Sequence, residues 1–271
     1  MSRSLVTVAT IRDAKRLNRR VTMLTCYDAT FAKLFSRAGV DLLLVGDSLG
    51  MAVQGHSTTL PVTVEDILYH TRAVVRGRGL VGPHVVADMP FMSYQASPTD
   101  ALRNAGRLLQ DGGAESVKLE GGAEMAPTVE RLVSAGIPVM GHIGLTPQSV
   151  HKFGGYKVQG RTESDADRLV RDAKALEDAG AYAIVLETIP AALGARITSA
   201  VSVPTIGIGA GASCDGQVLV GYDLLGLDPD FKPRFVKRQG NLGMEVAGAV
   251  ERFVAEVRSG SFPDDAHSYG A

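Results

Sequence analysis

The sequence predicts an α/β protein built as a TIM (β/α)8 barrel with an N-terminal capping helix. Short, wholly apolar runs such as residues 42–45 are typical of strands buried on both faces, as in a parallel sheet. Eight predicted strands alternate with helical patterns, and 271 residues suit one barrel domain. An open doubly wound sheet would alternate in the same way, but the first strand-to-helix turn lacks a glycine-rich dinucleotide fingerprint.

The composition excludes several classes of protein. Hydrophobic residues make up 45% of the chain and charged residues 21%, which is enough to bury a large core. The net charge of -1 gives no electrostatic reason to expect nucleic acid or an anionic membrane as a partner. The N-terminus lacks a signal-peptide core, and no apolar run reaches the length of about 18 residues typical of a membrane span. Two cysteines, Cys26 and Cys214, favour free thiols in a reducing compartment over a single disulfide, so we expect a cytoplasmic protein.

The elements follow from local patterns. A leading helix at 8–19 is expected to close the bottom of the barrel. The helices begin at capping residues such as Asp28 and Thr63 and end at glycines such as Gly39. The expected strands are residues 21–27, 42–46, 84–88, 116–120, 138–143, 182–187, 204–209 and 217–220. The expected helices between them are residues 29–38, 63–76, 97–111, 123–134, 162–179 and 190–200.

Two long connections and the C-terminal part complete the chain. Residues 48–61 and 144–161 are long polar loops that contain glycine, and such loops in barrels often carry function. A last amphipathic helix is expected at 241–258, followed by a loosely held tail at 259–271. Because the composition shows no domain-scale break, we predict one barrel domain over residues 1–271.

Ionisable residues end five consecutive predicted strands. A barrel directs the carboxyl ends of its strands to one mouth, where barrel enzymes have their active sites. Two of the residues lie two positions apart on one strand and therefore point to the same face. The set predicts a functional site and consists of Asp47, Asp88, Lys118, Glu120, His142 and Glu187.

Each of these residues alone also has a structural explanation. Asp47 would cap the following helix, and Lys118 would simply pair with Glu120. His142 would be a hydrogen-bonded core histidine, and Glu187 would form an ion pair with a lysine or arginine. These alternatives stay open, as does the choice between a tight turn and a phosphate site for the glycines of residues 207–211.

Taken together, the residue types suit metal-assisted enolate chemistry. Asp47 and Asp88 in one pocket would repel each other unless they shared a proton or held a cation. Oxygen ligands without cysteine or a paired histidine motif suit Mg²⁺ better than zinc. Glu187 is the candidate general base, which would remove a proton beside the carbonyl of an α-keto acid. The cation and Lys118 would then hold the developing negative charge.

Six stretches of the chain resemble a known enzyme family. They are residues 44–48, 86–91, 117–122, 141–149, 154–161 and 207–217, and the strings HIGLTPQSV and GGYKVQGR are highly specific. In this order, over roughly residues 5–265, the chain resembles ketopantoate hydroxymethyltransferase. No functional position departs from the pattern of that family.

The resemblance implies an activity, a cofactor and an assembly. A hydroxymethyl group would pass from 5,10-methylenetetrahydrofolate to 3-methyl-2-oxobutanoate and give 2-dehydropantoate (ketopantoate), a step of pantothenate and coenzyme A biosynthesis. The resemblance further implies a TIM barrel, Mg²⁺ as the metal that stabilises the enolate, and a ring-like homodecamer.

The resemblance also implies a role for each site residue. Asp47 and Asp88 would ligate Mg²⁺ directly, and Glu120 would belong to the same metal site, directly or through water. Glu187 would be the catalytic base. The implied substrate-binding residues are Asp47, Ser48, Asp88, Lys118 and His142.

Two rival interpretations remain at this point. Another Mg²⁺-dependent enolate barrel, of the isocitrate lyase and phosphoenolpyruvate mutase kind, would use similar carboxylates. Those enzymes commonly carry a loop cysteine in a Lys-Arg-Cys-Gly-His-like string, which does not occur here. The second rival is a non-enzymatic barrel that binds a small acid, but such a protein would not need a buried base beside a metal site.

Overall fold

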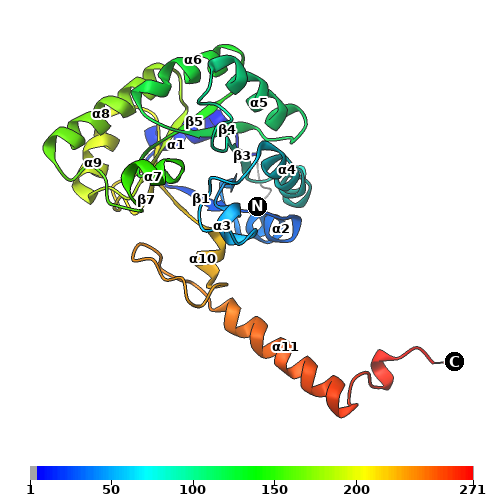
Figure 1. Cartoon of the computed structure of the whole chain (residues 1–271). Coiled ribbons are helices and arrows are strands. Elements are labelled where there is room, and N and C mark those ends of the chain that lie inside the picture. The colour runs from blue at the N-terminus through cyan, green and yellow to red at the C-terminus, as the bar shows by residue number, and fades with distance from the viewer. Residues whose placement is uncertain (1–4, 271) are drawn as a thin grey trace. The chain divides into compact units, whose positions relative to one another are not determined.

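A computed structural model describes residues 5–270 and shows a closed barrel of parallel strands in sequence order (Figure 1). Each strand pairs with the next, and the last pairs with the first. The strands are β1 (Val21–Thr25), β2 (Leu42–Val45), β3 (His84–Asp88), β4 (Ser116–Glu120), β5 (Val139–Gly144), β6 (Ala183–Glu187), β7 (Thr205–Ile208) and β8 (Gly216–Leu219). The predicted α/β TIM barrel is confirmed.

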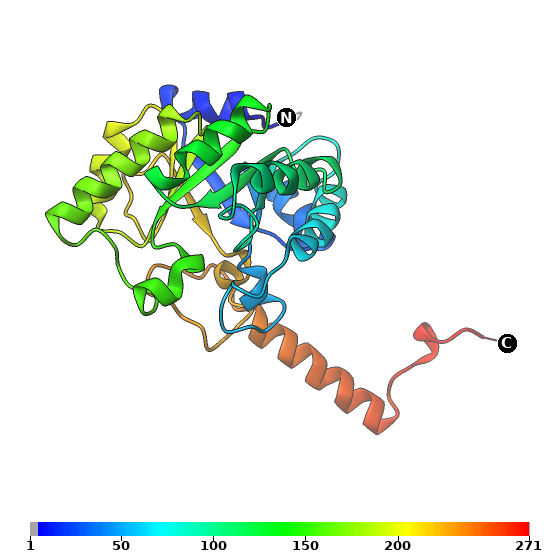
Figure 2. The same ribbon diagram turned by 45° about the horizontal axis from the view of Figure 1, so that its top comes forward.

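Helices alternate with the strands from β1 to β7 and surround the barrel, whereas in the described chain β7 and β8 follow each other without a helix between them (Figures 1 and 2). Those of the barrel are α2 (Ala29–Ala38), α4 (Val64–Arg78), α5 (Pro98–Gln110), α6 (Ala126–Ser134), α8 (Glu163–Asp178) and α9 (Ala191–Ala200), and the short η1 (Ala123–Met125) precedes α6. The expected caps form: the Asp28 side chain accepts hydrogen bonds from the first turn of α2, and the side chains of Thr63 and Asp66 build a capping box on α4. Gly39 ends α2 with a φ of 92°, which glycine adopts without strain.

The predicted N-terminal capping helix is α1 (Val8–Arg16), which closes the end of the barrel where the strands begin. Its Ile11 and Ala14 are fully buried in the same apolar cluster as strand residues such as Met23. Lys15 Nζ donates a hydrogen bond to the Val203 carbonyl, just before β7, and lies 3.2 Å from the Asp215 carboxylate, just before β8. The opposite end, where the strands finish, is left for the site.

Both long connections contain short helices that the sequence pattern does not predict. α3 (Leu49–Ala52) begins directly after Ser48, where the Leu49 and Ala52 amides donate hydrogen bonds to the Gly46 and Ser48 carbonyls. The connection after β5 forms η2 (Pro147–Ser149) and then α7 (Val150–Phe153). Both connections start at the carboxyl ends of strands and therefore lie at the site.

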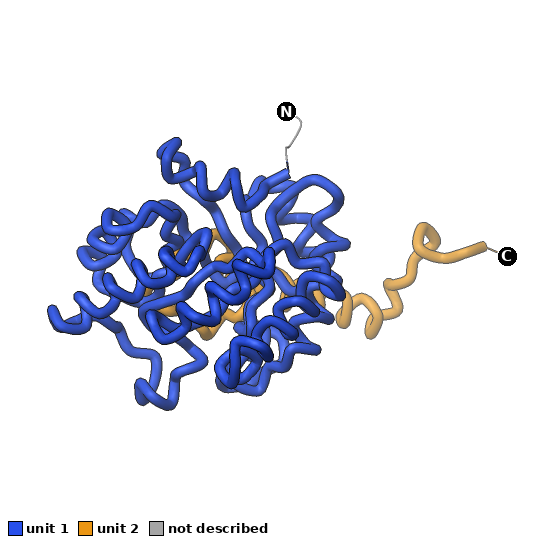
Figure 3. Tube along the Cα trace, turned by 90° about the horizontal axis from the view of Figure 1, so that it is seen from above, with its two compact units in different colours: residues 1–220 blue, residues 221–271 orange. Residues whose placement is uncertain are grey.

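The chain divides into two compact units, residues 1–220 and 221–271 (Figure 3). The second unit contains α10 (Gly221–Leu225), α11 (Leu242–Ser259) and η3 (Asp265–His267). α11 matches the expected helix at 241–258, and the prediction of a single domain over 1–271 stays a prediction. None of the α11 residues is buried in the described chain, and its exposed large apolar side chains are Met244, Val246, Val250, Phe253 and Val257. Within the described residues, no helix is long and apolar enough to cross a membrane.

Candidate active site

The register of β3, β4 and β5 sets the polar side chains of the site at two neighbouring levels. Side chains two apart on a strand share a face, so those of Lys118 and Glu120 on β4 both point to one side of the sheet. Asp88 of β3 is level with Lys118, and Glu120 is level with His142 of β5. Each side chain lies at or near the carboxyl end of its strand, where barrels build active sites.

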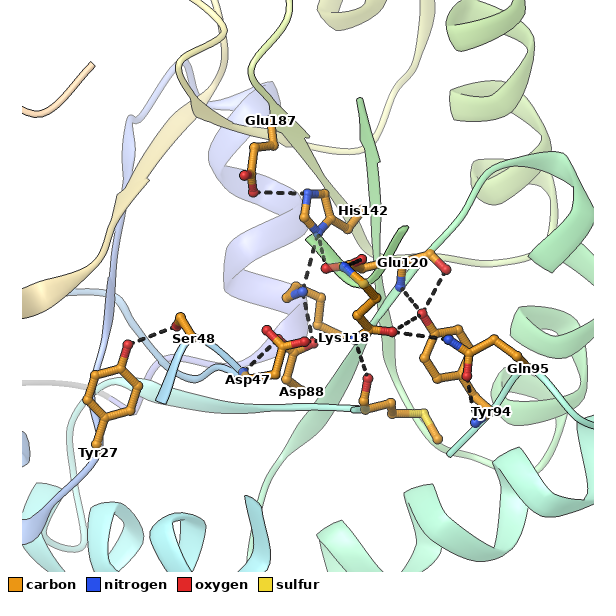
Figure 4. Close-up of polar contacts among 12 residues, drawn as sticks. Tyr27, Asp47, Ser48, Asp88, Tyr94, Gln95, Lys118, Glu120, His142 and Glu187 are labelled. Atoms are coloured by element: carbon orange, nitrogen blue, oxygen red, sulfur yellow. Dashed lines mark hydrogen bonds and ion pairs between the residues drawn. The ribbon is translucent and has the colours of Figure 1, made fainter. Parts of the chain in front are cut away.

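All seven residues expected from the sequence lie in one region of the molecule (Figure 4). Asp47, Asp88, Lys118, Glu120 and His142 are each at most 5% exposed. Direct contacts link them into one cluster, and Glu187 joins the cluster through His142. Ser48 lies beside Asp47 in the chain at the edge of this group.

Asp47 and Asp88 are in direct contact. The Asp47 backbone amide donates a hydrogen bond of 3.2 Å to Asp88 Oδ2. Burial and the neighbouring Asp88 carboxylate raise the pKa of Asp47 to about 7, against the opposing effect of Lys118. The helix-cap explanation for Asp47 is wrong, because α3 has Ser48 at its N-cap and no side-chain cap.

Lys118 is the counter-ion of the cluster. Its Nζ lies 2.8 Å from Asp88 Oδ1 in a buried ion pair. Burial alone would lower the pKa of Lys118, but Asp88, Glu120 and Asp47 raise it above its ordinary value. The lysine is therefore protonated.

Carboxyl groups outnumber ammonium groups around Lys118. Burial raises the pKa of Glu120 well above its ordinary value, although Lys118 opposes the shift. Three buried carboxyl groups, those of Asp47, Asp88 and Glu120, thus surround one ammonium group. A second positive charge would remove this imbalance.

His142 lies between the lysine and Glu187. Its Nδ1 is 3.3 Å from Lys118 Nζ and 3.5 Å from Glu120 Oε1, and its Nε2 is 3.2 Å from Glu187 Oε2. Burial and the Lys118 charge lower the pKa of His142, so the imidazole is neutral at pH 7. The interpretation of His142 as an isolated core histidine is wrong, because it contacts three other charged groups of the cluster.

The backbone around Glu187 is held on both sides. The Leu145 amide donates to the Glu187 carbonyl at 2.8 Å. Thr188 has a φ of 49°, which is strained for a β-branched residue. Its amide donates to the Ile208 carbonyl at 2.8 Å, and its own carbonyl accepts from the Gln159 amide at 3.0 Å. The Glu187 side chain is 17% exposed, so a substrate can reach it.

Three further polar residues complete the surroundings. Ser48 Oγ is 2.8 Å from the hydroxyl of buried Tyr27. Tyr94 and Gln148 are also buried, and Gln148 joins them to the cluster by hydrogen bonds to the Tyr94 hydroxyl and to Asp47. The sequence pattern predicts neither as a site residue. The only signal for Gln148 is its place in the string HIGLTPQSV, because its partners come from distant parts of the chain.

The donor set fits Mg²⁺, which keeps several water ligands, better than a metal that is held by protein ligands alone. No group of three or more His, Cys, Asp or Glu residues within the described part of the chain is arranged to hold a metal. Mg²⁺ usually keeps several waters and takes one or two carboxylates. Asp47 and Asp88 supply two adjacent buried carboxylates, and carboxylate oxygens are ligands that Mg²⁺ prefers.

Comparison with known structures shows the fold. A phosphonopyruvate hydrolase covers 97% of this chain and 92% of its own with a TM-score of 0.62 and 16% sequence identity. A 2,3-dimethylmalate lyase of the PEP mutase/isocitrate lyase superfamily covers 97% and 92% with a TM-score of 0.60 and 18% identity. At such identities the likeness concerns the barrel alone.

Comparison with protein families is more specific. The ketopantoate hydroxymethyltransferase family matches residues 5–265. The 3-methyl-2-oxobutanoate hydroxymethyltransferase of Anaeromyxobacter sp. (strain K) is 58% identical over 269 residues, which are 98% of this chain and 88% of that protein. The enzyme of Syntrophus aciditrophicus (strain SB) is 55% identical over 264 residues, 97% of this chain and 96% of that protein. The chain therefore belongs to the ketopantoate hydroxymethyltransferase family.

Proposed function

We propose that the strand-end cluster is the active site and that Mg²⁺ and 5,10-methylenetetrahydrofolate serve there as metal and co-substrate. Hydroxymethyl transfer to 3-methyl-2-oxobutanoate, a step of pantothenate biosynthesis, is the activity of the family and of this chain. One observation carries the assignment of the site. Three buried carboxyl groups surround Lys118, and Glu187 faces them across His142.

Asp47 and Asp88 are the proposed direct metal ligands, and Glu120 belongs to the same metal site, directly or through water. When bound, Mg²⁺ would polarise the α-keto acid and stabilise the negative charge of its enolate. Lys118, held by Asp88 and His142, adds a fixed positive charge beside the same position.

The remaining contacts would orient the substrate. Ser48, held by Tyr27, can offer its hydroxyl or backbone amide to the carboxylate of the keto acid. Lys118 and His142 lie deeper in the cluster and would face the keto group. Asp47 and Asp88 would belong to the substrate-binding residues as well as hold the metal.

Glu187 is the proposed base. It would take the proton from C3 of 3-methyl-2-oxobutanoate, and His142 Nε2 would keep its carboxylate in place. The C3 carbon of the enolate would then form the new carbon–carbon bond to the methylene carbon of the folate as one carbon–nitrogen bond of that carbon breaks. Water would supply the hydroxyl oxygen as the second carbon–nitrogen bond breaks, and tetrahydrofolate would leave with the nitrogens protonated.

We further propose that the chain acts as a cytoplasmic homo-oligomer, a decamer as in the family it resembles. The exposed apolar residues of α11 support an assembly, because an isolated helix of that kind has apolar surface to bury against a partner. Cys26 and Cys214 are both free and buried, which suits a reducing compartment. The near-neutral net charge of -1 gives no support for a nucleic acid or a membrane as partner.

A turnover assay with 3-methyl-2-oxobutanoate and methylenetetrahydrofolate tests the proposal. We expect ketopantoate formation that a chelator abolishes and Mg²⁺ restores. Asp47→Ala should remove both activity and the response to Mg²⁺, whereas Asp178→Ala, at an exposed carboxylate of α8, should change neither. Mg²⁺-stimulated turnover by Asp47→Ala would contradict the ligand assignment. Cleavage of 2-methylisocitrate in place of hydroxymethyl transfer would favour the lyase interpretation.

A further inference from the structure

Gln148 is a buried amide that bonds to three of the strand ends at once. It lies in η2, directly after β5, and is 5% exposed. Its side-chain Nε2 donates to Asp47 Oδ2 at 2.9 Å and to the Met89 carbonyl at 3.0 Å. Its backbone amide donates to Glu120 Oε2 at 3.0 Å. One residue therefore contacts the ends of β2, β3 and β4.

The orientation of the Gln148 amide is fixed by its partners. On its other side, Oε1 accepts from the Tyr94 hydroxyl at 2.8 Å and from Gln95 Nε2 at 3.1 Å. All four hydrogen-bonding positions of the side-chain amide are then in use. A flipped amide would set oxygen against Asp47 Oδ2 and the Met89 carbonyl, so only one orientation satisfies the neighbours.

Tyr94 anchors this arrangement to the sheet. Its hydroxyl accepts from the Glu120 backbone amide at 3.1 Å and also lies 3.0 Å from the Glu120 carbonyl. The Tyr94 ring is 1% exposed and cannot move freely. Hydrogen bonds from the Glu120 amide to Tyr94, from Tyr94 to Gln148 and from Gln148 to Asp47 thus fix the Asp47 carboxylate, which follows β2, relative to β4.

We propose that Gln148 is a positioning residue that sets the orientation of the Asp47 carboxylate for a divalent cation. The hydrogen bond to Oδ2 leaves the second oxygen, Oδ1, for the cation and restricts rotation of the carboxylate. The backbone bond to Glu120 Oε2 holds a second acidic group of the site from the same residue. Partners of this kind typically change metal affinity or activity by about 10- to 100-fold when removed.

This inference rests on the proposed metal function of the site, and direct cation binding tests it. Mn²⁺ replaces Mg²⁺ as the probe, and its binding to the full-length protein is measured by electron paramagnetic resonance without substrates. Gln148→Met keeps the length of the side chain and removes its hydrogen-bond donors. It should weaken Mn²⁺ binding by about 10- to 100-fold. It should also lower kcat more than it raises KM for the keto acid. Gln95→Met is the matched control, because it removes one bond to Gln148 Oε1 and leaves the bond to Asp47, so its Mn²⁺ affinity should stay within about 3-fold of the wild type.

The outcomes distinguish the metal function of the site from the positioning role of Gln148. If the wild-type protein binds no Mn²⁺, the proposed metal function fails. If the wild type binds Mn²⁺ and a folded Gln148→Met binds it equally well, the positioning role fails. If Gln148→Met does not fold, Tyr94→Phe decides, because it keeps the ring and removes the hydroxyl that anchors Gln148. We then expect weaker Mn²⁺ binding than in the Gln95→Met control, and wild-type affinity in Tyr94→Phe would overturn the inference.

Discussion

His142 Nε2 lies 3.2 Å from Glu187 Oε2, and the other ring nitrogen of His142 lies 3.3 Å from Lys118 Nζ. The imidazole is neutral, because burial and the Lys118 charge lower its pKa. A protonated lysine can only donate, so Nδ1 accepts and the ring proton belongs on Nε2, facing Glu187. The uncharged histidine therefore orients the carboxylate of the proposed base through its ring N–H.

Replacing His142 should slow proton removal from the substrate. In His142→Ala the Glu187 carboxylate loses its partner, and we expect deuterium exchange at C3 of 3-methyl-2-oxobutanoate to fall by about 100-fold, as for a displaced catalytic group. His142→Gln can still donate to Glu187 and should recover part of the rate. An unchanged exchange rate in His142→Ala would show that Glu187 needs no support from the imidazole.

The strained backbone next to Glu187 gives a second prediction. Thr188 has a φ of 49°, and its strain is maintained by the hydrogen bonds to Ile208 and Gln159. Thr188→Gly should leave stability unchanged or raise it by up to about 1 kcal/mol, because glycine adopts this φ without strain. Its kcat should fall, since the backbone that carries Glu187 becomes freer.

Thr188→Asn is the matched control for this experiment, because asparagine tolerates a positive φ but keeps a side chain. We expect Thr188→Asn to keep wild-type stability and a higher kcat than Thr188→Gly. Thermal unfolding and steady-state kinetics measured on the same preparations provide the comparison. A clear loss of stability in Thr188→Gly would show that strain is absent at this position.

At the opposite end of the barrel, His84 predicts a dependence of stability on pH. His84 Nε2 is 2.8 Å from Ser116 Oγ, and burial lowers the pKa of His84 to about 4 from an ordinary 6.5. Between these values the unfolded chain binds a proton that the folded chain does not. The free energy of unfolding should therefore decrease as pH falls from about 6.5 to about 4, by up to roughly 3 kcal/mol from this group.

Urea unfolding of wild type and His84→Gln between pH 7.5 and 4.5 isolates this contribution. The glutamine amide cannot titrate, so the variant should lose less stability than the wild type over the acidic part of the range. His151→Gln, at an exposed histidine, should follow the wild-type curve. Parallel curves for wild type and His84→Gln would contradict the assignment.

The apolar residues of α11 should control assembly. Phe253 and Val257 lie one helical turn apart and are 53% and 48% exposed. Phe253→Asp combined with Val257→Asp should give smaller species than the wild type in sedimentation velocity, because the charges would resist burial in an interface. Glu251→Ala on the same helix should leave the assembly unchanged. A double variant of wild-type size would exclude this surface from the interface.

Much of the fold follows from local sequence. β3 and β4 have the expected bounds, because each is an alternating or apolar run with a charged residue at its end. Other strands differ by one or two residues, as β1 does by ending at Thr25, since hydrogen bonding to a neighbour decides where a strand stops. The short helices α3 and α7 were not foreseen, because single turns carry too few residues to show a periodicity.

Some of the site residues likewise follow from local sequence, and others depend on the folded barrel. The strand-end residues could be found because parallel strands bring their carboxyl ends to one mouth whatever the details of packing. Gln148 could not, since its contact with Asp47 spans 101 positions in the chain and depends on how the barrel closes. The contact between His142 and Glu187 likewise depends on the pairing of β5 with β6.

The proposed reaction depends on Glu187 as the base. Deuterium exchange at C3 of 3-methyl-2-oxobutanoate tests this role most directly. The exchange is followed by proton NMR with Mg²⁺ and without folate. Omitting the folate separates proton removal from the later carbon–carbon bond formation. We expect the wild type and Glu130→Gln, at an exposed glutamate of α6, to exchange at the same rate. Glu187→Gln should be slower by about 10²- to 10⁴-fold, the usual contribution of a general base. Exchange by Glu187→Gln at the wild-type rate would contradict this role.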